Sequence, residues 1–189
     1  MGIKSKMKKV SIYTKRGDNG NTSLLGGRRV SKSAGIPSTI GEVDELSSRI
    51  GMLYAMANQG GHNFLLSLPH LRSIQSRLQD INTMLASPEN KREKVIQNLP
   101  SFTQELEAQI DHWEEKLPKL TKFILPGVTT LDAQAQLCRT QTRKVERELV
   151  KIWELPEALL PYINRLSDYF FVLARLVCHL QQHEDAFYT

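Results

Sequence analysis

The sequence predicts an all-α protein in which five helices form a bundle behind an N-terminal glycine-rich arm. Five segments place apolar residues alternately three and four positions apart, and Gly and Pro residues separate these segments. Apolar residues at this spacing share one face of a helix, and a bundle buries such faces against one another. Residues 15–37 are instead rich in Gly, Ser, Asn and Arg, a composition typical of loops. We therefore expect a single domain over 1–189, with the arm at 1–37 and the helical bundle at 38–185.

The composition is that of a globular chain. Of 189 residues, 40% are hydrophobic and 24% are charged, which excludes a disordered protein. No run of about 18 apolar residues occurs, so no membrane span is expected. The net charge of +5 favours an anionic partner such as a nucleotide, a nucleic acid or an acidic membrane. Cys138 and Cys178 each lie inside an apolar helical pattern, which predicts buried free thiols and a reducing compartment.

The predicted elements follow in order along the chain. Lys9–Thr14 alternates briefly in hydropathy and predicts a short strand or an extended arm. Thr39-x-x-Glu42 is a capping-box signature, which predicts the start of the first helix. The apolar seams of the five helices are Val43, Leu46, Ile50, Leu53 and Ala57; Leu71, Ile74, Leu78, Ile81 and Leu85; Phe102, Leu106, Ile110, Trp113, Leu117 and Leu120; Leu131, Ala135, Cys138, Thr142, Val145, Leu149 and Ile152; and Ile163, Leu166, Phe170, Leu173, Val177 and Leu180.

Helix-breaking residues lie between the seams. The separators are Gly60-Gly61, Ser87-Pro88, Pro118 and Pro126-Gly127, and Pro156 and Pro161 mark the start of the last helix. The polar segment Pro88–Pro100 predicts a mobile surface connection.

The first candidate site is the loop from Thr14 to Ser23, with sequence TKRGDNGNTS. Its two glycines allow tight turns that aim backbone N–H groups at an anion. Lys15 and the later Lys32 add positive charge, and the hydroxyls of Thr22 and Ser23 can bind phosphate or approach a metal ion. The alternative is an ordinary Asp-Asn-Gly turn, because the spacing is not that of a P-loop.

The second candidate is a cationic stripe on the fourth predicted helix. Arg139, Arg143 and Glu146 are spaced at i, i+4 and i+7, so they share one face, which Arg147 extends and Lys144 flanks. This face borders the apolar seam, and arginine forks suit a triphosphate. The alternative is a solvated charged face balanced by neighbouring glutamates.

The third candidate is Asn164-Arg-Leu-Ser-Asp168 in the last predicted helix. Asn, Ser and Asp are poor residues for a helix interior, so they mark either a frayed first turn or polar groups that face a site. His179 and His183 are four positions apart but lack the Glu of H-E-x-x-H, so a zinc site is not expected and no residue is assigned as a metal ligand.

Taken together, these stretches resemble the PduO-type ATP:cob(I)alamin adenosyltransferases from about Ile12 to the end of the last helix. Each stretch is a weak signal alone, whereas five in one order form a specific one. The anchors are Tyr13-Thr-Lys-Arg-Gly-Asp-Asn-Gly-Asn-Thr22, Gly41-Glu-Val-Asp-Glu-Leu46, Phe123-Ile-Leu-Pro-Gly127, Arg139-x3-Arg143-Lys-Val-Glu-Arg147 and Asn164-Arg-Leu-Ser-Asp168.

The resemblance implies a homotrimer of five-helix bundles with active sites between adjacent subunits. It implies an enzyme that transfers the 5′-deoxyadenosyl group from ATP, with Mg²⁺, to cob(I)alamin and releases triphosphate. It also implies a cytoplasmic protein with a reductase and an adenosylcobalamin-dependent enzyme as possible partners, and no nucleic-acid or membrane partner.

The resemblance further assigns residues of this chain to roles. Asp44 would pair with Arg139 across the subunit interface, and Phe123 would shield the lower axial face of the corrinoid. The residues expected around ATP are Thr14, Lys15, Arg16, Gly17, Thr22, Ser23 and Lys32 from one subunit, and Arg143, Lys144, Glu146, Arg147 and Asn164 from its neighbour.

Three residues depart from the family pattern. Arg16 stands where a small Thr is usual, Lys144 replaces a second consecutive Arg, and Val128 replaces the second Gly of Pro-Gly-Gly. Lys144 keeps the charge but loses the bidentate fork. Two alternatives therefore stay open: a cobalamin-binding or delivery protein without catalysis, and a non-catalytic helical bundle that binds nucleotide or nucleic acid.

Overall fold

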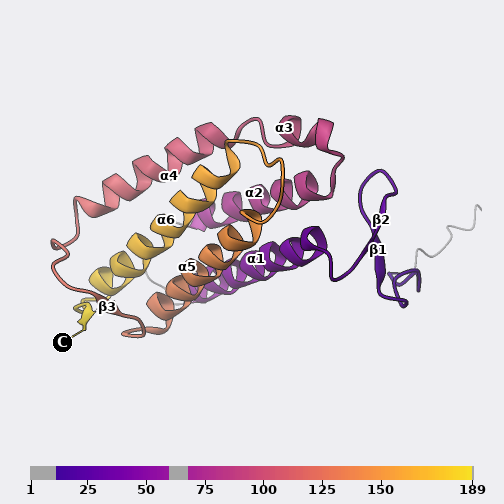
Figure 1. Ribbon diagram of the computed structural model, residues 1–189. Coiled ribbons are helices and arrows are strands. Elements are labelled where there is room, and N and C mark those ends of the chain that lie inside the picture. The colour runs from indigo at the N-terminus through magenta and orange to yellow at the C-terminus, as the bar shows by residue number, and fades with distance from the viewer. Residues whose placement is uncertain (1–11, 60–67, 189) are drawn as a thin grey trace, which may run out of the picture.

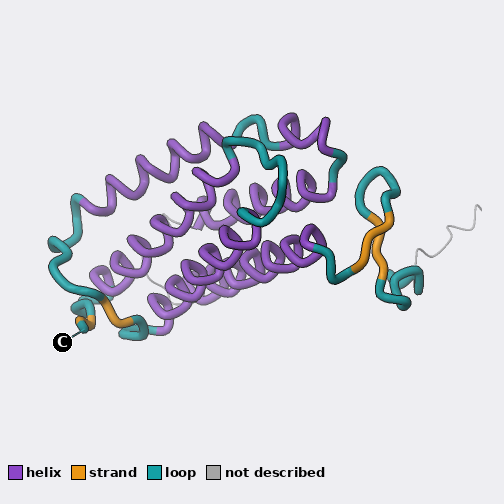
Figure 2. Tube along the Cα trace, viewed as in Figure 1, coloured by secondary structure: helices purple, strands orange, loops and turns teal. Residues whose placement is uncertain are grey.

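The described part of the chain, residues 12–59 and 68–188 of a computed structural model, is mostly helical (Figures 1 and 2). Its long helices are α1 (Gly35–Gln59), α2 (Leu68–Ala86), α4 (Leu99–Glu114), α5 (Thr130–Leu149) and α6 (Leu159–Leu180). A short α3 (Arg92–Val95), preceded by the 3₁₀ turn η2 (Glu89–Lys91), gives six α-helices in this part of the chain. The all-α prediction is thus confirmed, and each predicted seam lies on one long helix except at its end, where Leu117, Leu120 and Ile152 follow the last helical residue. No helix in 12–59 or 68–188 is both long and apolar enough to cross a membrane.

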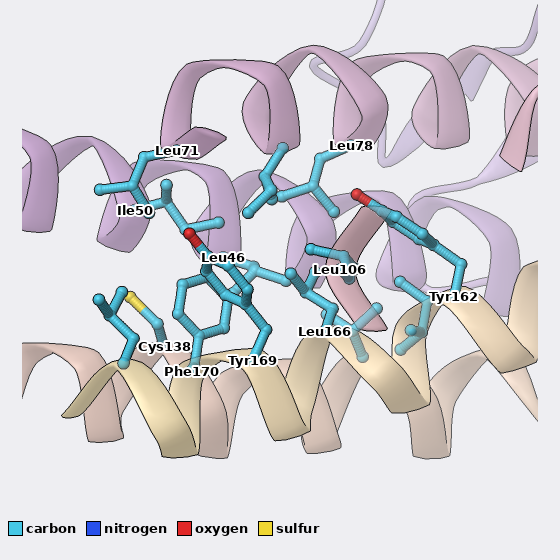
Figure 3. Close-up of a cluster of buried hydrophobic side chains, with 14 of the residues drawn as sticks. Leu46, Ile50, Leu71, Leu78, Leu106, Cys138, Tyr162, Leu166, Tyr169 and Phe170 are labelled. Atoms are coloured by element: carbon cyan, nitrogen blue, oxygen red, sulfur yellow. The ribbon is translucent and has the colours of Figure 1, made fainter. Parts of the chain in front are cut away.

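The core lies where the seams meet (Figure 3). Helix α5 packs against both α1 and α6, while α2 lies on α1 and α4 lies on α6. The aromatic ring of Tyr169 packs against those of Trp113 and Phe170, at centroid distances of 5.0 and 5.4 Å. Burial of large side chains of this kind contributes about 1.5–3 kcal/mol each, which fixes the helices as a rigid support for surface groups.

Both cysteines are free and buried, as predicted. Burial raises the pKa of the Cys138 thiol, and likewise that of Cys178, to about 12. The thiols therefore stay protonated and pack as small apolar groups.

Only the ends of some seams were wrong. Leu120 and Leu180 are exposed, because helix α4 ends at Glu114 and the seam of α6 reaches its last residue at Leu180. Leu117 and Ile152 likewise follow the ends of α4 and α5, and both are only half-buried.

The first helix begins earlier than its capping-box signature predicted. Helix α1 starts at Gly35, and Thr39 is buried inside it, where its hydroxyl donates a hydrogen bond of 2.9 Å to the carbonyl of Gly35. Pro37 fits the first turn, because the N–H groups there have no partner within the helix. Thr39 therefore satisfies a helix carbonyl and does not cap the helix.

The arm contains a hairpin where the sequence predicted only loop. Strands β1 (Asn21–Ser23) and β2 (Arg29–Ser31) pair antiparallel, with Thr22 opposite Val30. The connection between them uses Gly26 and Gly27, both at positive φ, a conformation that glycine adopts without a Cβ penalty. Lys9–Thr14 was predicted as a short strand or an extended arm, and residues 12–14 form no strand. Residues 9–11 lie outside the described ones, as do Gly60-Gly61.

The segment Pro88–Pro100 is structured rather than a free surface connection. It contains η2, α3 and the start of α4, and it buries Arg92, Ile96 and Leu99. The guanidinium of Arg92 donates to the carbonyl of Glu154 at 3.4 Å, which links this segment to the α5–α6 loop.

Helix α5 begins at a capping box that the sequence analysis did not identify. The Thr129 hydroxyl accepts from the Asp132 N–H, and the Asp132 carboxylate accepts from the N–H groups of Thr129 and Gly127. Asp132 is buried, so this carboxylate fixes the loop that precedes α5.

Candidate functional site

The arm gathers part of the first candidate site at the N-terminal end of α1. Gly17 lies directly beside Lys32: a Cβ added at Gly17 would meet Nζ of Lys32 at 3.3 Å. The N–H of Lys32 donates to the carbonyl of Gly20 at 2.9 Å, and Arg29 donates to the carbonyl of Arg16 at 3.1 Å. The loop is thus folded back onto β2, which brings Gly17 and the cation of Lys32 together.

The remaining loop residues differ in how they are presented. Thr14, Lys15 and Arg16 are exposed, and Lys15 has a positive φ of 57°. Thr22 is half-buried and Ser23 is exposed. Adjacent strand residues point to opposite faces, so the two hydroxyls lie on opposite faces of the hairpin. A single ligand on one face would therefore contact only one of them.

The cationic stripe of α5 is presented to solvent over its last two turns. Arg143 and Arg147 are exposed, and within residues 12–59 and 68–188 neither guanidinium lies within ion-pair distance of a carboxylate. Glu146, which lies between them in the sequence, is half-buried. Two unpaired guanidiniums one turn apart form a surface suited to a polyanion.

Lys144 forms an ion pair within the chain. Its ammonium lies 2.8 Å from Oε2 of Glu42 on α1, an oxygen that also accepts from Nε2 of Gln141 at 2.9 Å. The hydrogen bond from Lys144 holds the pKa of Glu42 below its ordinary value, although desolvation opposes this shift. The same contact raises the pKa of Lys144. Glu42 was predicted as the acid of the capping box with Thr39 and as part of a family motif, but not as the partner of Lys144.

Arg139 and Asp44, expected to pair across an interface, each have a different partner within the chain. Nε of Arg139 donates to Gln136 at 2.6 Å, and its guanidinium lies 6.0 Å from the ring of Phe171. Desolvation, and next the charge of Arg143, lower the pKa of Arg139. Asp44 accepts from Nδ2 of Asn82 at 2.5 Å. Both side chains remain partly or fully exposed, so each retains surface for a further contact.

The polar stretch of α6 divides into exposed and structural residues. Asn164 is exposed, whereas Ser167 is buried. Arg165 binds Asp168 at 2.6 Å and Glu107 on α4 at 3.0 Å, so these charges link α6 to α4. Asn164 is therefore the polar residue of this stretch that remains available to bind a ligand.

Phe123 directly precedes a strand of a second small sheet at the other end of the molecule. Strands β3 (Ile124–Leu125) and β4 (Ala186–Phe187) pair antiparallel beside the C-terminal end of α6 (Figure 1). Phe123 is 85% exposed, a high value for an aromatic side chain, and its carbonyl accepts from the N–H of Tyr188 at 2.8 Å. The structure thus holds the backbone of Phe123 while its ring projects outward.

Within a single chain, the expected site residues that the structure describes do not lie together. The arm and the β3–β4 sheet lie at opposite ends of the helices (Figure 1). No hydrogen bond or ion pair joins the arm to α5 among the residues that the structure describes. The basic stripe lies between these ends, on the C-terminal half of α5.

Among the described residues, no group of three His, Cys, Asp or Glu side chains is placed to hold a metal ion. His179 and His183 are exposed and line a cavity of about 230 Å³ beside the C-terminal tail, together with Arg175 and Asp185.

Comparisons with known proteins agree with these motifs. The cobalamin adenosyltransferase family model matches residues 12–177. The corrinoid adenosyltransferase MMAB of Homo sapiens is 34% identical over 184 residues, covering 94% of this chain and 72% of the human protein. The corrinoid adenosyltransferase of Bacillus subtilis is 40% identical over 173 residues, covering 89% of this chain and 86% of that protein.

Solved structures show the same fold. A variant of the PduO-type ATP:corrinoid adenosyltransferase from Lactobacillus reuteri, complexed with cobalamin and ATP, has a TM-score of 0.86 and 34% sequence identity. The match covers 94% of this chain and 99% of that one. A second variant from the same source, complexed with ATP, has a TM-score of 0.84 and 36% identity, covering 94% and 100% of the two chains. The expected enzyme class, an ATP-dependent corrinoid adenosyltransferase, is confirmed, and the chain belongs to the cobalamin adenosyltransferase family.

Proposed function

We propose that this enzyme joins ATP and cob(I)alamin in sites formed between neighbouring copies of a homotrimer of five-helix bundles. The observation that carries the proposal is the pair of exposed guanidiniums of Arg143 and Arg147 on α5, which form no ion pair with any residue that the structure describes. Their positive charge is matched to the triphosphate that leaves ATP. The arm supplies a second cationic surface around Gly17 and Lys32.

The distribution of the candidate residues supports a site made of two chains. Within one chain the arm extends away from the helices, beyond the N-terminal end of α1 (Figure 1). An arm that reaches a neighbouring copy could close over that copy's α5, with Asn164 of α6 alongside. In the same assembly, Arg139 and Asp44 would pair between subunits through the surface that each keeps exposed. The trimer is testable by size-exclusion chromatography with light scattering.

The reaction is a displacement at C5′ of ATP. The cobalt of cob(I)alamin, a strong nucleophile, attacks C5′; the cobalt–carbon bond forms as the C5′–oxygen bond breaks, and its electron pair leaves with triphosphate. The protein therefore needs no general base. Its residues hold C5′ toward the corrinoid and stabilise the charge that develops on triphosphate.

Different residues would contact ATP from the arm and from α5. Thr14, Lys15, Arg16, Gly17 and Lys32 would enclose the phosphates from the arm, with either Thr22 or Ser23. Arg143, Lys144, Glu146 and Arg147 would contact ATP from α5. Mg²⁺ would arrive bound to ATP, because it prefers oxygen ligands and keeps phosphates and waters in its shell. The hydroxyl oxygens of Thr22 and Ser23 are of the type that can coordinate Mg²⁺.

Phe123 would work on the corrinoid. An outward-facing aromatic ring that occupies the lower axial side excludes a ligand from cobalt, which makes Co(II) easier to reduce to Co(I). The 85% exposure of Phe123 supports this role, because a ring with no internal packing function is free to contact a large apolar surface. A reductase that supplies the electron and an enzyme that accepts the product stay expected partners, and a cytoplasmic location stays a prediction.

The decisive experiment is an anaerobic turnover assay with purified protein, MgATP and chemically reduced cobalamin. We expect a light-sensitive product with the spectrum of adenosylcobalamin, and none when ATP is omitted. ATP binding without product would overturn the proposal in favour of a delivery protein. Salt-sensitive affinity for DNA or RNA without turnover would overturn it in favour of a nucleic-acid-binding bundle.

A further inference from the structure

The C-terminal strand β4 is the only described segment that pairs with β3, next to Phe123. Ile124 lies opposite Phe187, and Leu125 lies opposite Ala186. The N–H of Tyr188 continues the pairing through its 2.8 Å hydrogen bond to the carbonyl of Phe123. The last residues of the chain thus hold the backbone of the residue that the proposed function places beneath the corrinoid.

The register places three exposed apolar side chains on one face of this sheet. In an antiparallel pair, residues directly opposite each other and residues two apart on one strand share a face. Phe123 therefore shares a face with Tyr188 opposite it and with Leu125 two residues on. These side chains are 85%, 64% and 47% exposed. Pairing of β4 with β3 therefore places Tyr188 on the face that carries Phe123.

A two-stranded sheet of this length is not stable alone, so it requires an anchor. Arg175 on α6 is buried at 5% exposure and provides one. Its Nε lies 3.0 Å from Oδ2 of Asp185, the residue directly before β4, and its terminal nitrogen donates to the carbonyl of Pro118 at 2.7 Å. One guanidinium therefore ties together α6, the C-terminal tail and the segment that leads to Phe123.

The Asp185 carboxylate is also largely buried, with its side chain 11% exposed. Removal of one partner of a buried ion pair leaves an uncompensated charge, which favours release of the segment that carries it. Release would fall on the segment of Asp185, because Arg175 lies within the long packed helix α6 whereas the element after Asp185, β4, has only two strand residues.

We propose that Arg175 and Asp185 are positioning residues that hold β4 on β3 and thereby fix Phe123 toward the corrinoid. This inference rests on the proposed function, which gives Phe123 its role. The pair touches neither ATP nor the reacting atoms; it acts through the backbone of the β3–β4 sheet. Loss of the pair should impair the corrinoid step and leave intact the binding of ATP, which the proposed function assigns to the arm and α5.

The first test compares Asp185→Asn with Glu184→Gln, which removes an adjacent exposed carboxylate that has no ion pair among the described residues. In Asp185→Asn we expect the Tyr188 amide to exchange about 10-fold faster or more, because its hydrogen bond opens locally. We expect kcat for adenosylation to fall about 10-fold or more through misplacement of Phe123. The KM for ATP should stay within about twofold. Glu184→Gln should match the wild type in all three.

A spectroscopic measurement separates positioning from general destabilisation. With MgATP and cob(II)alamin bound, the electron paramagnetic resonance spectrum reports whether a lower axial nitrogen is bound to cobalt. We expect this nitrogen signal to be weak in the wild type and in Glu184→Gln, and to increase in Asp185→Asn. Arg175→Lys retains the charge but not both hydrogen bonds. Its nitrogen signal should therefore lie between that of the wild type and that of Asp185→Asn.

A second pair of variants tests the backbone contact without changing the ion pair. Tyr188→Pro removes the N–H that binds the Phe123 carbonyl, whereas Tyr188→Ala removes only the side chain. We expect kcat for Tyr188→Pro to lie at least about fivefold below that for Tyr188→Ala, the effect of one lost hydrogen bond of about 1 kcal/mol.

The possible failures are distinct. Unchanged exchange of the Tyr188 amide in Asp185→Asn, or equal kcat for the two Tyr188 variants, would overturn the positioning role and leave the proposed function standing. Absence of turnover in the wild type would overturn the proposed function and the role of Phe123 with it. Parallel loss of ATP binding and kcat in Asp185→Asn would show a merely structural pair.

Discussion

Lys144 on α5 and Glu42 on α1 form an ion pair, with 2.8 Å between Nζ and Oε2, inside the surface expected to bind ATP. Gln141 strengthens the pair from α5, because its side-chain amide donates both to this carboxylate and to the backbone carbonyl of Glu42. The free protein therefore already partly neutralises Lys144. Arg143 and Arg147 carry the charge that remains available to a triphosphate.

Neutralisation of Glu42 should strengthen ATP binding. Glu42→Gln removes a negative charge near the expected triphosphate and frees Lys144, so the Kd for MgATP should fall about threefold at low salt. Isothermal titration calorimetry measures this change. Glu45→Gln is the control, because Glu45 is on the same helix but pairs with Arg49. Weaker ATP binding by Glu42→Gln would show instead that the carboxylate is needed to orient Lys144.

The same pair should make stability depend on pH in the acid range. The pKa of Glu42 is lowered in the folded state, first by its hydrogen bond from Lys144, so the charged carboxylate stabilises the fold. This contribution is fully present above the ordinary carboxyl pKa of 4.5 and is lost as pH falls through the lowered folded value.

Urea unfolding of the wild type and Glu42→Gln at a series of pH values measures this effect. At pH 7 the wild type should be only slightly more stable than the variant, as expected for an ion pair with an exposed lysine. The difference should shrink as the pH falls below 4.5. A difference that stays constant from pH 7 to strongly acidic pH would contradict the assignment.

Arg143→Ala should separate catalysis from folding. Arg143 is exposed and has no carboxylate partner among the described residues, so its loss should change the free energy of unfolding by no more than about 0.5 kcal/mol. If it stabilises the leaving triphosphate, kcat/KM should fall about 100-fold or more. Helical circular dichroism and anaerobic turnover give the two readings. Lys151→Ala, which removes an exposed cation just beyond α5, should keep full activity; full activity in Arg143→Ala would refute its assigned role.

Asp132→Ala should destabilise the protein through the start of α5. The buried carboxylate accepts from the N–H groups of Thr129 and Gly127, and its removal leaves both donors without that partner. The expected loss is about 1–3 kcal/mol in the free energy of unfolding, measured by urea denaturation. Thr130→Ala, at an exposed position in the same turn, should cost less than about 0.5 kcal/mol. Equal losses in both variants would contradict the capping role of Asp132.

The long helices could be predicted because their signals are local and repeated. Residues such as Leu46, Ile50 and Leu53 recur at helical spacing, and each is buried as predicted. Thr39 shows the limit of a short motif: the same Thr-x-x-Glu letters that mark a helix start also occur inside α1. At Thr129 and Asp132 the motif was genuine, but Asp stands in place of the more familiar Glu.

The small sheets could not be predicted because they carry almost no periodic signal. Ile124 and Phe187 pair across more than 60 positions of sequence, and each strand contains two residues. For the same reason the sequence named Phe123 without the tail that supports it. It also placed Lys144 beside ATP without its partner Glu42, because a contact between α1 and α5 depends on how the helices pack.

Phe123→Ala should produce a defect that depends on the oxidation state of the cobalamin supplied. The side chain is 85% exposed, so its loss should change the free energy of unfolding by less than about 0.5 kcal/mol. If the ring excludes a lower axial ligand, its main effect is on the reduction of Co(II), not on the attack of Co(I) at C5′. Turnover that starts from cob(II)alamin with a weak reductant should therefore fall about 100-fold, as for loss of a positioned group. Turnover that starts from fully reduced cob(I)alamin should fall much less. Leu120→Ala, at an exposed position a few residues earlier, should leave both rates unchanged. Equal defects of Phe123→Ala in the two assays would show that the ring acts on alkyl transfer itself and not on the reduction.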